Sequence, residues 1–267
     1  MKNSHTWPGK AETVFFADLD NTLIYSYKRE INVPVTWVEQ YQGRDISFMT
    51  EMSWSLLQQV RRQALFVPAT TRTVEQYQRI TFGTPPPEYA LVCNGGVLLV
   101  HGKKDEDWYE ESAALTADCR KELKLAEQIL EQDTQVTFEI RNIEGLFVFT
   151  KSARPEETMA GLKTRLDESR VEICSHGVKI YVIPRSLSKG EAVKRFRKRI
   201  QPRQAIAAGD SRFDISMLEE ADIALAEKSL AAEQIRQEHI FYPKKDGYFS
   251  DFVLEYVKNF LCEAVLL

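Results

Sequence analysis

The chain has 267 residues, a net charge of −4, and 43% hydrophobic and 28% charged residues, as in ordinary globular proteins. The acidic balance excludes the basic field that attracts nucleic acids and anionic membranes, and no apolar run is long enough to span a bilayer. The four cysteines and four histidines are scattered, which argues against a disulfide framework, a zinc site or a histidine-based mechanism. Because such cysteines fit reduced thiols and residues 1–10 lack the apolar core of a signal peptide, we expect a cytoplasmic protein.

The first predicted strand, Val14–Ala17, ends in a run of polar residues. Asp18, Asp20 and Thr22 follow it, each separated by one residue. In open α/β sheets, ligands bind at the carboxyl ends of the strands. Two carboxylates this close repel each other unless a cation lies between them, and an all-oxygen ligand set indicates Mg²⁺. Asp and Asn are also favoured in turns and N-caps, so this segment alone leaves both interpretations open.

A long connection follows this strand, and residues 1–12 before it are polar and are expected to form a loose arm. Within the connection, Val33–Val38 and Ile46–Met49 flank Gln42-Gly43-Arg44, which predicts a hairpin over the strand ends. The side chains of this segment that are candidates for ligand contacts are Tyr25, Trp37 and Arg44. An ordinary packed hairpin is the alternative.

Helices and strands then alternate. The predicted elements are a helix at Ser53–Gln63, a strand at Leu65–Ala69 that ends in Thr70-Thr71-Arg72, a helix at Val74–Phe82 capped by Thr73, and a strand at Tyr89–Cys93 that ends in Asn94-Gly95-Gly96. This order predicts a parallel sheet with crossover helices.

The pattern changes from about residue 112 to residue 183. The predicted elements there are a helix at Ser112–Gln132, strands at Gln135–Ile140 and Leu146–Thr150, a helix at Pro155–Glu168, and strands at Val171–Ser175 and Val178–Ile183. Two successive helix-strand-strand units predict a small α+β domain with an antiparallel sheet, residues 112–183, inserted into an α/β core of residues 1–111 and 184–267. The alternation resumes with a helix at Lys189–Ile200, a strand at Ala205–Ala208, a helix at Ile215–Glu220, a strand at Ile223–Leu225 and a helix at Phe252–Leu261.

Three further places resemble the end of the first strand in position. Thr70 follows a predicted strand, where its hydroxyl can donate to a phosphate oxygen. Lys189 starts a helix, where its charge opposes the helix dipole unless an anionic group lies nearby. Asp210 and Asp214 follow the strand that ends at Ala208 and can reach the same metal. Each signal also has an ordinary structural interpretation, but their recurrence at element ends favours one common site.

These segments, in this order, resemble the four motifs of the haloacid dehalogenase superfamily: Asp18-Leu-Asp-Asn-Thr, Thr70-Thr-Arg, Ser188-Lys-Gly-Glu and Gly209-Asp-Ser-Arg-Phe-Asp. Asn94-Gly-Gly, the inserted domain and Asp246-Gly247 resemble the Cof-type and sucrose-phosphatase-like branch of this superfamily. The resemblance spans nearly the whole chain. It implies a Rossmann-like parallel-sheet core and a cap of the C2 type between the second and third motifs.

The resemblance also implies catalytic roles. Asp18 is expected to attack a phosphorus atom and become an aspartyl phosphate, which splits one hard displacement into two easier ones. Asp20 is expected to protonate the leaving oxygen and then to activate water. Thr70 and Lys189 are expected to bind the transferring phosphoryl group and to neutralise its charge. Because dehalogenating relatives lack an acid at the position of Asp20, we predict a phosphatase.

Metal and substrate contacts follow from the same resemblance. The implied Mg²⁺ ligands are Asp18, the backbone carbonyl of Asp20, and Asp210, with Asp214 in support. The expected substrate contacts are Thr70, Thr71, Arg72, Asn94 and Lys189. Two positions depart from the pattern of relatives: Phe213 stands where Asn usually supports the metal, and Thr71 stands where glycine is usual.

We therefore predict a Mg²⁺-dependent phosphomonoesterase that acts on a small phosphorylated metabolite such as a sugar phosphate, without nucleic-acid or membrane partners. A phosphohexomutase-like phosphotransferase and a non-catalytic binding module that keeps the fold are the alternatives. The basic run Lys194–Arg199 could contact nucleic acid, although a solvated helix face fits the acidic total better. The substrate and the oligomeric state do not follow from the sequence.

Overall fold

The computed structural model describes residues 12–236 and 238–264, so the arm predicted at residues 1–12 lies outside the described residues except for Glu12. The chain forms two compact units, a core unit of Met1–Lys104 and Lys189–Leu267 and an inserted unit of Asp105–Ser188. The inserted unit spans Asp105–Ser188, where the sequence predicts residues 112–183. It begins with a helix, α3 (Glu106–Leu115), which the Asp105 carboxylate caps by accepting from the Trp108 N–H at 2.7 Å.

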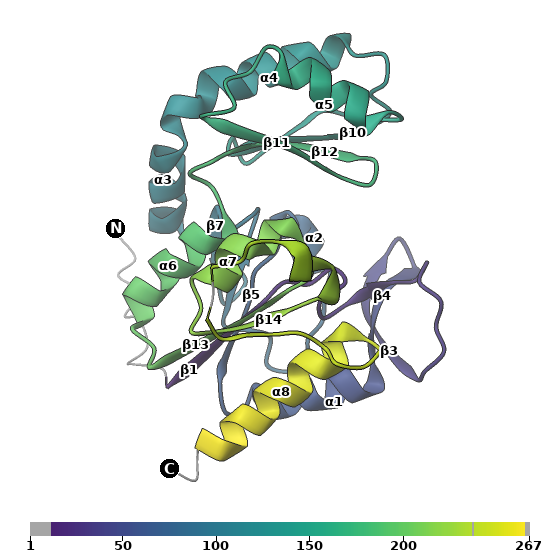
Figure 1. Cartoon of the computed structure of the whole chain (residues 1–267), viewed down its shortest axis with the longest axis vertical. Coiled ribbons are helices and arrows are strands. Elements are labelled where there is room, and N and C mark those ends of the chain that lie inside the picture. Colours follow the sequence, from purple (N-terminus) through teal and green to yellow (C-terminus); the bar gives the residue numbers. More distant parts are fainter. Residues whose placement is uncertain (1–11, 237, 265–267) are drawn as a thin grey trace. The chain divides into compact units, whose positions relative to one another are not determined.

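The core unit is built on a five-stranded parallel sheet in the order β15-β14-β13-β1-β5 (Figure 1). Its strands are β1 (Thr13–Ala17), β5 (Leu65–Pro68), β13 (Gln204–Gly209), β14 (Ile223–Ala226) and β15 (Ile240–Phe241). Every residue of β1 is buried, as expected for a parallel strand that is covered on both faces. The predicted α/β class is confirmed, although β15 was not predicted.

The helices of the core unit are α1 (Glu51–Val60), α2 (Val74–Gln78), α6 (Lys189–Ile200), α7 (Ile215–Glu219) and α8 (Phe249–Ala264), with short 3₁₀ turns η2 (Arg212–Asp214) and η3 (Lys228–Ala232). The predicted cap Thr73 is confirmed: it forms a reciprocal capping box with Gln76 at the start of α2. Phe196 of α6 packs edge to face on Phe16 of β1, with ring centroids 5.7 Å apart, which fixes α6 against β1. In the basic run, Arg197 pairs with Asp222 at 2.8 Å and so has a structural partner.

A three-stranded antiparallel sheet contains the predicted hairpin. Its strands are β2 (Tyr25–Ser26), β3 (Val35–Tyr41) and β4 (Arg44–Thr50), in the order β2-β4-β3. Gln42 and Gly43 turn the chain with left-handed φ angles of 52° and 73°, a conformation that glycine adopts without strain. We call β3 and β4 the flap hairpin.

The segment after the predicted strand at Tyr89–Cys93 differs from the expected crossover pattern. The strands β6 (Tyr89–Val92), β7 (Val97–Val100) and β8 (Lys103–Lys104) form a separate antiparallel sheet. A single parallel bridge from Ala69 to Leu91 connects it to the end of β5. Cys93 and Asn94 have left-handed φ angles of 52° and 57°, so the chain turns back as a hairpin instead of entering a helix.

The inserted unit is an α+β layer. Its elements after α3 are η1 (Ala117–Cys119), α4 (Arg120–Gln132), β9 (Arg141–Ile143), β10 (Phe147–Lys151), α5 (Pro155–Lys163), β11 (Val171–His176) and β12 (Lys179–Pro184). The strands form an antiparallel sheet in the order β11-β12-β10-β9, and α4 and α5 share an apolar core with it. The predicted inserted α+β domain is confirmed as a fold.

Two predictions inside this unit are wrong in detail. The strand expected at Gln135–Ile140 is absent, and Val136 makes only an isolated bridge to Ser152; the strand that pairs with β10 is β9. The single helix expected at Ser112–Gln132 is broken at Thr116, which ends α3 with a ψ angle of 3°. Among the described residues, no helix combines the length and apolarity that a membrane crossing needs.

Candidate active site

The carboxyl edge of the central sheet collects polar side chains. Asp18 follows β1 directly, Asp210 follows β13, and Thr70 comes two residues after β5. These three strands are neighbours and run parallel, so their carboxyl ends meet at the same edge. The Asp18 N–H donates to the Ala208 carbonyl at 2.9 Å, which places the first and last motifs side by side.

Lys189 lies at the centre of this group. Its ammonium donates to Asp18 Oδ1 at 2.5 Å and to Asp214 Oδ1 at 2.6 Å, and the side chain is 1% exposed. Burial alone would lower the pKa of Lys189, but the two carboxylates outweigh it and raise that pKa, so the ammonium stays charged. These carboxylates also remove the penalty expected for a lysine at a helix N-terminus.

The acidic cluster consists of Asp18, Asp210 and Asp214, each of which offers one oxygen within 4.8 Å of the others. Burial raises the pKa of Asp18 well above its usual range; Lys189 opposes this shift and Asp214 adds to it. Burial and the Asp214 charge raise the pKa of Asp210 to about 7. One lysine therefore does not balance the three carboxylates. This surplus of buried oxygen ligands fits a divalent cation.

Asp214 is held on both oxygens. Oδ1 accepts from Lys189, and Oδ2 accepts from the Ser211 hydroxyl at 2.8 Å and from the backbone N–H groups of Ser211 and Asp210 at 3.0 and 3.2 Å. Its neighbour Phe213 stands where the resemblance implies an Asn. The hydrogen bonds from Ser211 and Asp210 orient the carboxylate of Asp214 toward Lys189.

Gly209 allows the last motif to pack this tightly. A Cβ at Gly209 would lie 2.2 Å from the Cβ of Asp214, which no real packing permits. We expect Gly209→Ala to displace Asp214 and loosen Lys189, lowering turnover by ~10²-fold, because displacements of about 1 Å have such effects. The matched control is Gly161→Ala in α5, where a Cβ meets no atom within 4 Å. Unchanged turnover in Gly209→Ala, measured beside this control, would contradict the packing argument.

Thr22 has a role that the sequence analysis did not assign. Its hydroxyl donates to Asp210 Oδ1 at 2.9 Å and so connects the first motif to the last. A tight turn brings it there, with left-handed φ at Asn21 (65°) and backbone hydrogen bonds that return to the Leu19 carbonyl. The position of Thr22 two residues after Asp20 was the available signal.

Asp20 lies apart from the buried cluster. Its side chain is half-exposed, and both oxygens accept from Arg72, which donates from Nε and Nη2 at 2.8 Å each. The third nitrogen of Arg72 donates to the buried carboxylate of Glu39 at 2.9 Å. Burial alone would lower the pKa of Arg72, but Asp20 and Glu39 outweigh burial and raise that pKa above its ordinary value. Arg72, a predicted substrate contact, is thus engaged by two carboxylates, and sequence analysis missed Glu39.

The remaining predicted contacts occupy the loop ends beside the cluster. Thr70 is fully buried, and its hydroxyl accepts from the Arg72 N–H at 3.2 Å. The N–H of Asn94, also buried, donates to the Thr70 carbonyl at 3.0 Å, whereas Thr71 is partly exposed. Of the flap candidates, Trp37 is exposed, but Tyr25 is fully buried, and its hydroxyl accepts from the Ser250 N–H. Tyr25 therefore packs in the interior of the core unit.

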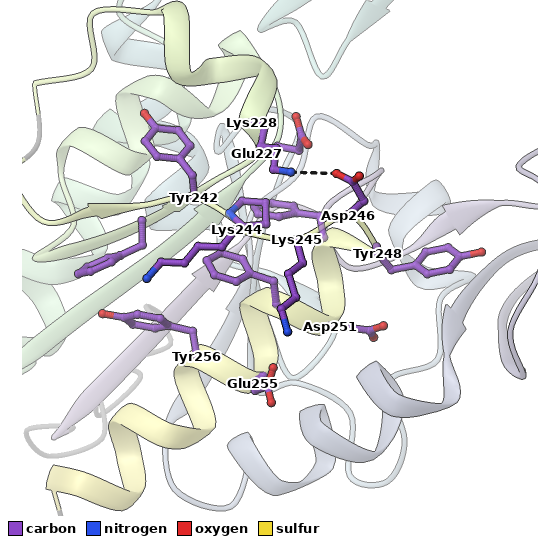
Figure 2. Close-up of a pocket in the computed structure, with 15 residues that line it drawn as sticks. Glu227, Lys228, Tyr242, Lys244, Lys245, Asp246, Tyr248, Asp251, Glu255 and Tyr256 are labelled. Carbon is purple, nitrogen blue, oxygen red and sulfur yellow. Dashed lines mark hydrogen bonds and ion pairs between the residues drawn. The ribbon is translucent and has the colours of Figure 1, made fainter.

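Asp246 and Gly247, part of the predicted branch signature, line a pocket of about 750 Å³ between η3 and α8 (Figure 2). Asp246 pairs with Lys228 across it at 3.0 Å. Another lining residue, Asp251, accepts hydrogen bonds from Thr50 and Ser53 at the start of α1. These interactions connect the last loop and helix of the chain to the rest of the core unit.

The core unit is thus an α/β fold with a cluster of aspartates at the carboxyl edge of its parallel sheet. A family model described as haloacid dehalogenase-like hydrolase matches residues 98–229. This match and the fold agree with the resemblance to haloacid dehalogenase-like hydrolases found in the motifs. A comparison with curated protein sequences finds no match.

Solved structures of the same fold cover nearly the whole chain. The sucrose-phosphatase of Synechocystis, in complex with sucrose and phosphate, has a TM-score of 0.61 at 16% identity, covering 93% of this chain and 98% of its own. A trehalose-6-phosphate phosphatase related protein has a TM-score of 0.57 at 16% identity, covering 94% and 99%. A phosphatase of the superfamily from Bacteroides thetaiotaomicron has a TM-score of 0.54 at 15% identity, covering 97% and 98%.

Proposed function

We propose that the chain is a Mg²⁺-dependent phosphomonoesterase that acts on a small sugar phosphate through an aspartyl phosphate on Asp18. The observation that carries this proposal is the arrangement of Asp18, buried at the end of β1, with Lys189 on one oxygen and further acids beside it. Lys189 orients the carboxylate, and because burial raises the pKa of Asp18, a cation that favours the ionised form suits the nucleophile.

In the first step, a carboxylate oxygen of Asp18 attacks phosphorus while the bond from phosphorus to the leaving oxygen breaks. The leaving oxygen takes its electron pair and receives a proton from Asp20, which enters the cycle in its protonated form. Lys189 and Thr70 donate to the phosphoryl oxygens, whose charge spreads in the transition state. Asp18, the carbonyl of Asp20 and Asp210 would hold Mg²⁺, which when bound supplies positive charge that lowers the repulsion between nucleophile and phosphate.

In the second step, water attacks the phosphorus of the aspartyl phosphate. Asp20, now ionised, accepts a proton from this water, and the bond between phosphorus and the Asp18 oxygen breaks. The electron pair returns to the Asp18 carboxylate, and inorganic phosphate leaves. Each carboxylate ends in its starting state, so the cycle is balanced.

The sugar phosphate is proposed because the structures that share the fold include a sucrose-phosphatase and a trehalose-6-phosphate phosphatase related protein. A panel of phosphorylated metabolites assayed with Mg²⁺ tests it. We expect release of phosphate from one or more sugar phosphates, loss of activity in EDTA, recovery with Mg²⁺ and inhibition by excess Ca²⁺, which prefers more ligands at longer distances. Full activity of dialysed protein in EDTA would remove the metal from the mechanism, and transfer of phosphate back to the sugar would indicate a mutase instead.

We also propose that the inserted unit, Asp105–Ser188, acts as a cap that selects the substrate and excludes water. Its position in the sequence between the second and third motifs supports this role. Deleting the unit should abolish discrimination among sugar phosphates while small aryl phosphates are still hydrolysed. If the shortened chain folds, as judged by circular dichroism, and its substrate preference is unchanged, the unit is not a selecting cap.

A further inference from the structure

Glu39 of the flap hairpin is a buried acid that the mechanism above does not use. Its side chain is 1% exposed, yet it bears a charge in a strand whose neighbours Gln40 and Tyr41 face solvent. The Ser47 hydroxyl of β4 donates to Oε2 at 2.6 Å, and Arg72 donates to the same oxygen at 2.9 Å. The Nε of Arg79 lies 3.3 Å from Oε1 without a well-formed hydrogen bond.

A β-bulge directs this side chain inward. The register between β3 and β4 shifts on both sides of Glu39, between Trp37 and Glu39 and between Glu39 and Gln40. As a result Val38 and Glu39 are both buried, which breaks the alternation of a regular strand. Bulges that redirect side chains are common beside active sites. The backbone of Glu39 also forms an antiparallel bridge to Ile80, on the side away from β4, so backbone contacts on both sides hold this residue in place.

The charges form a continuous chain from the flap hairpin to Asp20. Glu39 holds Nη1 of Arg72, and the opposite edge of the same guanidinium forms a two-point ion pair with Asp20. Because the guanidinium is planar and rigid, a hydrogen bond that fixes one edge of Arg72 also fixes the edge that contacts Asp20. A buried ion pair of this kind is poor evidence of a stabilising role, since apolar residues of similar volume often stabilise as well or better.

We propose that Glu39 is a positioning residue that fixes Asp20 for acid–base catalysis by anchoring Arg72. The inference rests on the proposed function, because Asp20 must be the acid for its orientation to matter. Asp20 is half-exposed on a loop, and Arg72 donates to both oxygens of its carboxylate and so restrains it. Glu39 therefore acts on the chemistry without contacting the substrate. The flap hairpin in turn contributes to the site through this acid, in addition to any contact from its exposed side chains.

The test compares two leaving groups. The ratio kcat/KM covers the steps up to departure of the leaving group, so it reports on the acid. In Glu39→Gln, which keeps the shape and removes the charge, we expect kcat/KM to fall about tenfold with a sugar phosphate, a part of the ~10²–10⁴-fold that acid–base catalysis contributes. With p-nitrophenyl phosphate, whose leaving group needs no proton, we expect a change within about twofold. Equal losses with both substrates would overturn the proposal.

A double variant separates positioning from a loss of stability. If Glu39 acts through Asp20, Glu39→Gln should cause no further selective loss in an Asp20→Asn background, whereas independent effects would multiply. The matched control is Ser53→Ala, which removes an equally buried hydrogen-bonding group near the flap hairpin that contacts Ser250 and Asp251 and not Arg72. We expect its effect, if any, to be equal for the two substrates.

Two outcomes keep this inference separate from the proposed function. If Asp20→Asn itself shows no dependence on the leaving group, the proposed mechanism fails and the inference fails with it. If Asp20→Asn shows the dependence and Glu39→Gln does not, only the positioning role fails. Should Glu39→Gln not fold, Arg72→Lys replaces it: lysine keeps the charge and loses the two-point contact. The same selective loss with the sugar phosphate is expected there, and an equal loss with both substrates would overturn the proposal.

Discussion

Replacement of Asp18 by asparagine should reduce turnover to background at every Mg²⁺ concentration. An amide cannot attack phosphorus under these conditions, so no phosphoenzyme forms and added metal restores nothing. The loss should exceed the ~10²–10⁴-fold that general acid–base catalysis contributes, because the covalent route itself is removed. The measurement is phosphate release from a sugar phosphate and from p-nitrophenyl phosphate, with both substrates expected to fail together.

Stability measurements show whether Asp18→Asn loses activity because it unfolds. Burial raises the pKa of Asp18 in the folded chain. At pH values above the usual carboxyl pKa, the ionised Asp18 therefore lowers the stability of the folded state. Removing its charge should therefore not unfold the metal-free protein, and we expect a melting temperature in EDTA at least equal to that of the unmodified chain. Asp45→Asn, the same change at an exposed acid of the flap hairpin, is the control and should leave turnover within about twofold. Residual Asp18→Asn activity that grows with Mg²⁺ would reduce Asp18 to a metal ligand.

Replacement of Asp20 by asparagine should give a different defect. The variant keeps the backbone carbonyl proposed to face the metal and loses only the proton shuttle. With a sugar phosphate, turnover should fall by ~10²–10⁴-fold. With p-nitrophenyl phosphate, formation of the phosphoenzyme should be much less affected, because that leaving group departs as an anion. Phosphoenzyme should then accumulate, since its hydrolysis still lacks a base.

Burst kinetics distinguish these steps. A rapid release of p-nitrophenol, followed by slow turnover, is the expected signature of Asp20→Asn and should be absent in Asp18→Asn. If the two variants show equal defects on both substrates, and high Mg²⁺ rescues both, the two aspartates merely hold the metal.

The central part of the site could be predicted because it depends on local rules. A short apolar strand followed by Asp18 and Asp20 marks a carboxyl edge, and parallel topology brings neighbouring strand ends together. Lys189 was identified because a lysine at the start of a helix is unfavourable unless an anionic group lies nearby. In the structure, the carboxylates of Asp18 and Asp214 are those groups. Local sequence signals were sufficient where the fold itself determines proximity.

Other features depend on contacts between distant segments, which the local sequence does not determine. The contact of Thr22 with Asp210 needs a particular turn, and the inward direction of Glu39 needs a bulge, which a pattern of alternating residues does not reveal. Tyr25 was a candidate for a ligand contact because it lies in the connection that forms the hairpin, but packing against Phe48 and Tyr248 buries it. The region of the wrong strand at Gln135–Ile140 is rich in strand-forming residues, and tertiary pairing selected the next segment instead.

The covalent intermediate is the most direct test of the proposed mechanism. Asp20→Asn protein is mixed with phosphate-labelled substrate, quenched in acid within the burst, and digested for peptide mapping by mass spectrometry. We predict the label on the Asp18 carboxylate, at a stoichiometry that matches the burst, and none in the Asp18→Asn, Asp20→Asn double variant. Label on another residue, or product formation in a burst that leaves the protein unlabelled, would contradict the assignment of Asp18 as the nucleophile.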